Sequence, residues 1–363
     1  MARYRQLFLL IVIWLSAPLG FSAEVERLYE TEVRVQDRGN EERAKGISLA
    51  LRQILIKVSG DRDVPNRMGV RKAFKKPQQF VQQFRYRSQD QAEGDPFIRL
   101  WVSFDSTAVN RFLREAGVPI WGKARPVMLV WLAVEEPAVR YLLGADNNPK
   151  LSGLVLDEAQ RRGIPVTLPL LDLQDRSIID FTSVWGGFHD TAITASERYQ
   201  AESILIGRFY QDTREGYGAR WTLLQQDQVL NWTSSGYLPV EVIADGIDNA
   251  VDSVATRYAP KVALGEQREL LLHVDGVRDL KAYARVSDYL SSLTPVERST
   301  IHQVKPDAVV YALKLRTDIP NLQQVIQLGN TLIKAQPMEI SGNPVDEIAE
   351  LFSRLTLKYR LQP

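Results

Sequence analysis

The chain has 363 residues, of which 45% are apolar and 25% are charged, and its formal net charge is +1. This length can supply cores for two or three domains, and the composition is that of a globular protein rather than a disordered one. The lack of cysteine excludes disulfides and thiol lipidation, and the near-neutral charge gives no reason to expect a nucleic-acid partner.

Residues 1–23 have the pattern of a secretion signal. Arg3 and Arg5 precede an unbroken apolar run at 7–15, which is far shorter than the roughly 20 residues that a membrane-spanning helix requires. We expect cleavage after Ala23, which removes both arginines and changes the formal net charge from +1 to −1. The protein would then be periplasmic. If the segment is retained, the protein would instead be a membrane-anchored accessory factor of the inner membrane.

Residues 24–124 are expected to form an α+β domain. The stretch TEVRVQD alternates apolar and polar residues, as a strand does, and Asn40 then begins a helix. FIRLWVSF predicts another strand and STAVNRFLREAG a short helix. The apolar residues of the first helix recur at spacings of three and four, which places them on one buried face: Ile47, Leu51, Ile54, Leu55 and Val58.

The first helix ends in Ser-Gly and is followed by Asp61 and Asp63, a pair that could suggest a cation site. A calcium loop needs further oxygen ligands at fixed intervals, and no glutamate closes such a loop here. We therefore interpret the stretch as a helix stop. Gly60 would take the left-handed conformation, while the aspartates, neutralised by nearby arginines, solvate the turn.

Residues 117–124, GVPIWGKA, contain the Gly-x4-Gly-Lys spacing of a phosphate-binding loop. Such a loop follows a strand and opens a helix, whereas this stretch follows an expected helix and precedes an expected strand. Ala124 also stands where Ser or Thr would bind magnesium. We expect this stretch to be a connection between two domains. We also expect that the protein binds no nucleotide and no other cofactor.

Residues 125–262 are expected to form an α/β domain. The runs VMLVWLAV, PVTLPLL and SILIGRFY are apolar throughout and alternate with helical stretches, which is typical of a mostly parallel sheet covered on both faces. YGARWTLLQ and QVLNWTSSGY meet near Gln226 and predict an antiparallel hairpin at the sheet edge. A helix at 240–258 closes the domain.

Residues 263–363 follow the order β-α-β-β-α-β, which is the ferredoxin-like arrangement. ELLLHVDGV supplies the first strand, and TLIKAQPMEI supplies the last. The tail LTLKYRL could add one more strand. The expected fold class is therefore α/β and α+β, in three modules.

Together these stretches resemble the domain of unknown function 2066 family, a group of uncharacterised bacterial envelope proteins. The resemblance rests on ALRQILIKVSG, FVQQFRYR, the segments ILIGRF, ARWTLL and NWTSSG, and the long stretch VDGVRDLKAYARVSDYLSSLTPVERSTIHQV. It implies an envelope location and no particular chemistry. The middle region also looks like the small α/β domains of periplasmic scaffolding and lipoprotein-regulator proteins, which implies protein binding.

Carboxylates at strand ends are the strongest catalytic candidates. Glu135 and Glu136 end one apolar strand of the middle domain, and Asp172 and Asp175 follow the next. Ligands of open α/β sheets bind beyond the carboxyl ends of the strands, so two parallel strands would bring these four side chains to one edge. There they could act as acid and base or hold a cation, or they could only solvate the strand ends.

A second candidate is the loop WGGFHD, where adjacent glycines free the backbone ahead of His189 and Asp190. The alternative is a turn that leads into a helix. The chain has three histidines, and none is spaced from another as zinc ligands are, so we expect no metal site.

Trp221 and Trp232 lie on the two strands of the expected hairpin. If both rings are on its exposed face, they would form a protein interface. The alternative is that both rings cover the core of the middle domain.

We interpret the chain as an exported, non-catalytic binding or scaffold component of the cell envelope. Its expected partner is another envelope protein, and it would contact the membrane only if the signal segment is retained. An envelope hydrolase that uses the strand-end carboxylates or the WGGFHD loop is the alternative.

Overall fold

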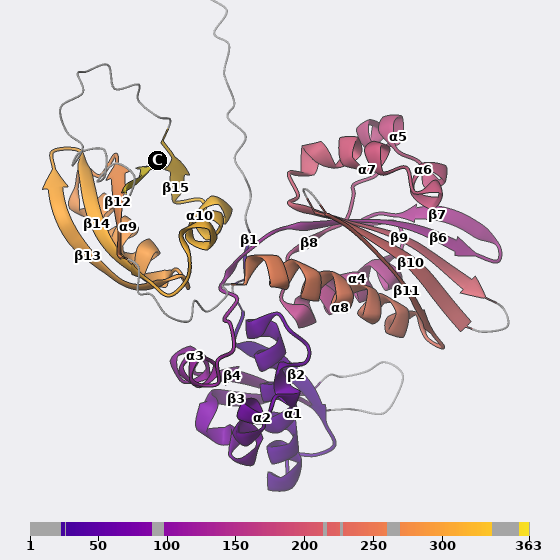
Figure 1. Ribbon diagram of the computed structural model, residues 1–363. Coiled ribbons are helices and arrows are strands. Elements are labelled where there is room, and N and C mark those ends of the chain that lie inside the picture. Colours follow the sequence, from indigo (N-terminus) through magenta and orange to yellow (C-terminus); the bar gives the residue numbers. More distant parts are fainter. Residues whose placement is uncertain are drawn as a thin grey trace, which may run out of the picture.

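The computed structural model describes residues 23–25, 27–88, 98–212, 216–225, 228–259, 269–335 and 356–362. These residues form ten α-helices and three sheets of three or more strands, with some parallel pairing, so the fold is mixed α/β. Each of the three sheets belongs to a different part of the chain (Figure 1). The expected signal segment lies outside the described residues except for Ala23.

The amino-terminal sheet has three antiparallel strands in the order β2-β4-β3, and helix α1 packs on it. The five apolar residues predicted for the buried face of α1 are at most 3% exposed, which confirms that prediction. The elements of this part are β2 (Glu30–Val35), α1 (Asn40–Ser59), α2 (Met68–Arg71), β3 (Val81–Ser88), β4 (Ile98–Phe104) and α3 (Ser106–Glu115).

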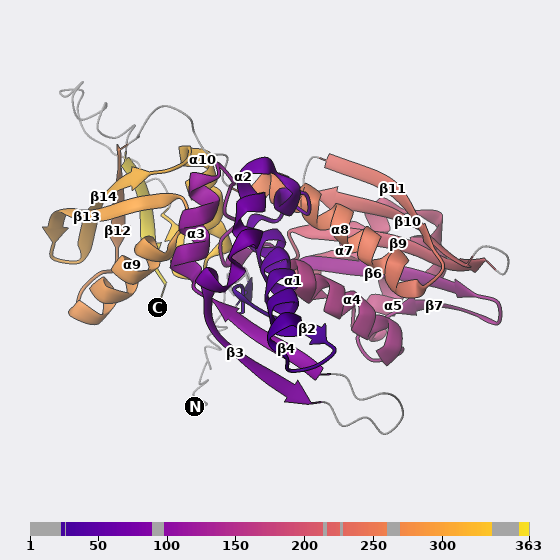
Figure 2. The same ribbon diagram turned by 90° about the horizontal axis from the view of Figure 1, so that it is seen from below.

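The middle sheet has the order β11-β10-β9-β6-β7, and β8 also pairs with β6. Helices α4 and α8 cover one face of the sheet, and α5, α6 and α7 cover the other (Figures 1 and 2). The elements are β6 (Met128–Glu136), β7 (Val139–Leu143), α4 (Pro149–Arg162), β8 (Val166–Thr167), α5 (Leu173–Ile178), α6 (Phe181–Gly186), α7 (His189–Ser196), β9 (Ser203–Asp212), β10 (Gly216–Gln225), β11 (Gln228–Gly236) and α8 (Pro239–Tyr258).

The prediction of a mostly parallel middle sheet is wrong. Strand β6 pairs in parallel with β8 and β9, whereas the β6–β7, β9–β10 and β10–β11 pairs are antiparallel. The apolar runs reflect helices on both faces of the sheet, and the short connections within each hairpin can join only antiparallel neighbours. Strand β8 is shorter than expected because Pro165 and Pro169 have no N–H to donate. The edge hairpin is confirmed as β10 and β11.

The carboxyl-terminal sheet has the order β13-β14-β12-β16-β15. The elements up to β15 follow the expected succession, but the ferredoxin-like strand order is not reproduced, because β16 lies parallel to β12 and separates it from β15. The expected residues 336–340 of the last strand lie outside the described residues. The elements are β12 (Glu269–Asp275), α9 (Leu280–Ser292), β13 (Val296–Lys305), β14 (Ala308–Leu315), α10 (Ile319–Leu328), β15 (Leu332–Lys334) and β16 (Thr356–Leu361).

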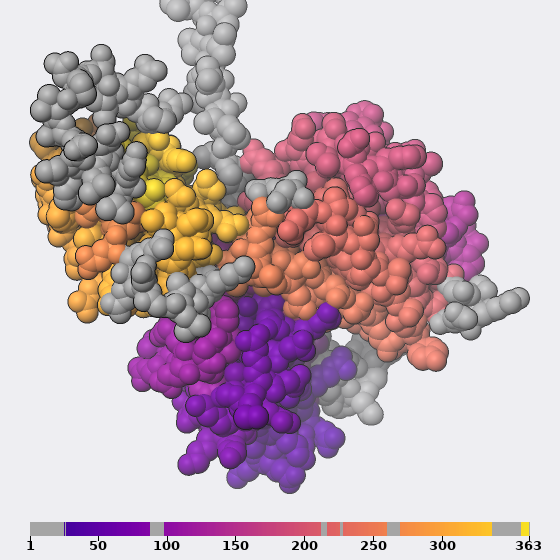
Figure 3. All heavy atoms as spheres, viewed as in Figure 1, coloured from indigo at the N-terminus to yellow at the C-terminus, as the bar shows by residue number. Residues whose placement is uncertain are grey.

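The three parts of the chain contact one another around α8, as the space-filling view shows (Figure 3). Leu328 of α10 joins the core beneath α8. The two-residue strand β1 (Ala23–Glu24) pairs with β5 (Ala124–Arg125), at the start of the middle part. A cavity of about 540 Å³ lies where all three parts meet, and tyrosines from each of them line it: Tyr29, Tyr258 and Tyr289.

Candidate functional site

Asp172 and Asp175 both stabilise the first turn of α5. Asp172 caps the helix by accepting a hydrogen bond from the Asp175 N–H at 3.0 Å, and it pairs with Arg198 at 2.7 Å. Asp175 is fully buried, pairs with Arg198 at 3.1 Å and accepts the Tyr199 hydroxyl hydrogen at 2.5 Å. The ion pair with Arg198 lowers the pKa of Asp172 to about 2. Both carboxylates therefore hold local structure.

Glu135 and Glu136 end β6 as expected, but the two aspartates do not join them. Strand β8 pairs with β6 only at Met128 and Leu129, six and more residues before Glu135. The shared edge predicted for the four carboxylates is therefore wrong, because β8 ends early. Glu135 instead accepts a hydrogen bond from Arg140 Nε at 2.6 Å. Both glutamates line an open cavity of about 920 Å³.

The WGGFHD loop is a turn between two helices, as its alternative interpretation held. Gly187 has φ of 73° and ends α6, and its N–H donates to the carbonyl oxygens of Ser183 and Val184. His189 and Asp190 are the first two residues of α7, where His189 is half-buried and Asp190 exposed.

Trp221 and Trp232 are direct cross-strand partners, but their rings are not on the exposed face. Trp221 is buried in the core under α8, and its ring nitrogen donates to the Ser234 hydroxyl at 3.0 Å. Trp232 is half-buried against the same core. The exposed interface predicted for the two rings is wrong because α8 packs over this face of the hairpin.

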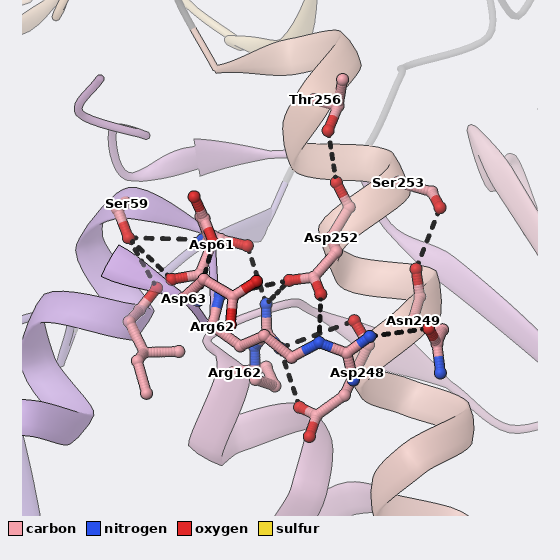
Figure 4. Close-up of polar contacts among 12 residues, drawn as sticks. Ser59, Asp61, Arg62, Asp63, Arg162, Asp248, Asn249, Asp252, Ser253 and Thr256 are labelled. Carbon is pink, nitrogen blue, oxygen red and sulfur yellow. Dashed lines mark hydrogen bonds and ion pairs between the residues drawn. The ribbon is translucent and has the colours of Figure 1, made fainter. Parts of the chain in front are cut away.

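The Ser-Gly-Asp stretch after α1 lies at a polar interface between the amino-terminal and middle parts (Figure 4). We call this interface the joint; it is formed by Gly60 and Arg62 on one side and by Arg162 and Asp252 on the other. Gly60 has φ of 76°, the left-handed conformation expected of a helix stop. Asp61 accepts the Asp63 N–H at 2.7 Å and pairs with Arg67 at 2.5 Å. Within the described ranges, no group of three or more acidic or histidine side chains could hold a metal ion.

Arg162, at the end of α4, is the buried centre of this joint. Its guanidinium donates to the Gly60 carbonyl at 2.7 Å and pairs with Asp248 at 2.8 Å and Asp252 at 2.6 Å. Arg62 reaches the other carboxylate oxygen of Asp252 at 2.8 Å. Asp252 of α8 therefore pairs with one arginine of the amino-terminal part and one of the middle part (Figure 4).

Arg125 is a second fully buried arginine at the same boundary. It donates to the carbonyl oxygens of Lys57 at 2.7 Å and Gly163 at 2.6 Å, and it stacks on the ring of Trp121. Burial lowers the pKa of Arg125, whereas the carbonyl acceptors favour its charged form.

The predictions from the sequence do not include this joint, although the spacing of aspartates in α8 indicates it. Asp245, Asp248 and Asp252 recur at intervals of three and four residues on a helix that is otherwise largely apolar. Such a stripe on a buried helix predicts basic partners from a neighbouring element, because buried carboxylates need them.

Strand β11 is the exposed edge of the middle sheet. It pairs with β10 over nine consecutive residue pairs without a register shift, and in the part of the chain that the structure describes no strand pairs with its other side. Its sequence, QVLNWTSSG, contains no charged residue and no proline. Val229 and Leu230 are 53% and 36% exposed.

The comparisons with known proteins match one part of the chain. A family model described as Domain of unknown function (DUF8605) matches residues 22–122, which contain the amino-terminal sheet. The resemblance to the domain of unknown function 2066 family is therefore wrong: the matching family is a different one. The stretches that suggested it consist of packing and turn residues, which unrelated families share.

No curated protein matches the chain, and no solved structure does. Among the helices of the described residues, none combines the length and apolarity that membrane crossing requires.

Proposed function

We propose that this is an exported, non-catalytic binding or scaffold protein of the cell envelope that binds another envelope protein through strand β11. Three modules, at residues 24–124, 125–262 and 263–363, would make up its mature chain, with periplasmic location following from the pattern of residues 1–23. The observation that carries the proposal is the uncharged, exposed edge of β11.

An uncharged edge strand is unusual because an unpaired row of N–H and C=O groups invites another strand. The other edge strands of three or more residues in the described ranges all carry charge: β2, β3, β7, β13 and β15. β13, which is about as long as β11, also has two register shifts, and such irregularities block strand addition. β11 has neither form of protection. It is therefore suited to accept a strand from a partner, with specificity from pockets for alternate side chains.

The contacts of the candidate catalytic carboxylates support a role without catalysis. Asp172 and Asp175 are held by Arg198, and Glu135 is held by Arg140. Each of these contacts stabilises a turn or a hairpin.

The test is to place charge on β11 and measure partner capture by crosslinking in intact cells. We expect Val229→Lys combined with Ser235→Lys to reduce the captured partner about tenfold or more, because lysines on an edge disfavour strand addition. Both side chains are exposed, so the thermal midpoint should change little.

The matched control is Val304→Lys on β13, an edge residue that is 67% exposed in another sheet. It should leave capture unchanged. Capture that survives the β11 substitutions, or is lost equally in the control, would refute the assignment of β11.

A further inference from the structure

The cavity of about 920 Å³ beside Glu135 is lined by two arginines that the described chain leaves without a counter-ion. It lies at the end of the middle sheet, between the β6–β7 hairpin, strands β9 and β10, and α6. Besides both glutamates, its lining includes Arg140, Arg208, Arg220, Trp185 and Tyr210. The volume falls within the range of small-molecule sites and far exceeds that of a single ion.

Arg208 and Arg220 are direct cross-strand partners on β9 and β10. Side chains at such positions are about 4.5–5.5 Å apart at Cβ, and like charges there are destabilising. Arg140 has Glu135 as its partner, but among the described residues neither Arg208 nor Arg220 has an ion pair or a side-chain hydrogen bond. The pair therefore places two uncompensated positive charges side by side at the cavity wall.

The surroundings of Arg208 are shaped to keep its guanidinium in place. A Cβ atom at Gly187, the residue that ends α6, would collide with that guanidinium. Arg208 is half-buried and packs against the end of α6, whereas Arg220 is exposed to solvent. Trp185, two residues before Gly187, stacks on Phe181 and adds an aromatic surface to the same cavity.

We propose that this cavity binds a small organic phosphate, with the phosphate group between Arg208 and Arg220 and the organic part against Trp185 and Tyr210. A phosphate monoester carries close to two negative charges near neutral pH, which matches the two free guanidinium groups better than one carboxylate does. Glu135 and Glu136 also line the cavity, so the organic part is uncharged or positive. The inference is independent of partner binding at β11.

Calorimetric titration of the full mature chain with phenyl phosphate, inorganic phosphate and benzoate tests the proposal. We expect phenyl phosphate to bind most tightly, because inorganic phosphate lacks the ring and benzoate lacks the second charge. Arg220→Gln and Arg208→Gln should each weaken binding of phenyl phosphate by about tenfold or more. Arg298→Gln, on the exposed strand β13, is the control and should bind as the wild type does.

Arg220 is exposed, so Arg220→Gln should leave the fold intact. This variant therefore tests phosphate binding even if Arg208→Gln unfolds the protein. Absence of heat with both phosphates at millimolar concentration would overturn the proposal, as would unchanged affinity in Arg220→Gln. Equal affinity for phenyl phosphate and inorganic phosphate would overturn the role of Trp185 and Tyr210.

Discussion

Arg162 is the residue on which the joint between the amino-terminal and middle parts depends most. It is fully buried, and its removal would leave the buried Gly60 carbonyl without this donor and take one of two arginine partners from each of Asp248 and Asp252. We expect Arg162→Met to lower the free energy of unfolding by about 3 to 5 kcal/mol, measured by denaturant titration. Arg161→Gln, which alters a partly exposed neighbouring pair with Asp248, should cost about 1 kcal/mol or less. Equal losses in the two variants would contradict this account of the joint.

Asp172 gives a pH-dependent prediction at the same scale. Arg198 lowers its pKa from 3.8 to about 2 in the folded chain. A carboxyl group with a lowered pKa stabilises the fold above its unfolded pKa, and this contribution disappears as the pH falls through the folded pKa. Arg198→Gln should therefore lower the thermal midpoint at neutral pH, and its difference from the wild type should shrink between about pH 4 and about pH 2. A difference that stays constant over that interval would show that the pair does not titrate as described.

At the scale of elements, the inserted strand β16 gives the next prediction. Tyr359 of β16 is buried in the core of the carboxyl-terminal sheet, between β12 and β15. Tyr359→Ala should cost about 3 to 5 kcal/mol of unfolding free energy, as for other large aromatic truncations. Lys358→Ala, an exposed position on the same strand, should stay within about 0.5 kcal/mol of the wild type. Similar small effects of both changes would mean that β16 is not part of this sheet in solution.

The elements also show which features the sequence could predict. The buried face of α1 follows from local spacing, and the edge hairpin follows from alternation and a short turn. The partners of β6 and the insertion of β16 depend on contacts between distant segments, which no local pattern encodes. Trp221 illustrates the same limit, because alternation in β10 indicates two faces but only the position of α8 decides which is buried.

For the whole molecule, the joint predicts that the amino-terminal and middle parts unfold together. A Cβ atom at Gly60 would collide with Ala255 of α8 and the ring of Trp121, and its positive φ disfavours other residues. We expect Gly60→Ala to separate one calorimetric transition into two. Gly117→Ala is a matched control, since Gly117 also has a positive φ but has no atom within 4 Å of its Cβ position. If Gly117→Ala splits the transition equally, backbone strain rather than the joint is responsible.

Site-specific photocrosslinking most directly tests the proposed binding of a partner protein at β11. A photoreactive amino acid would replace Val229 on β11 or, as a comparison, Val304 on β13, both exposed edge positions. In intact cells, we expect position 229 to give a discrete adduct with a different envelope protein and position 304 to give none. Equal adducts from both positions, or an adduct at 229 only with a second copy of this chain, would contradict the claim.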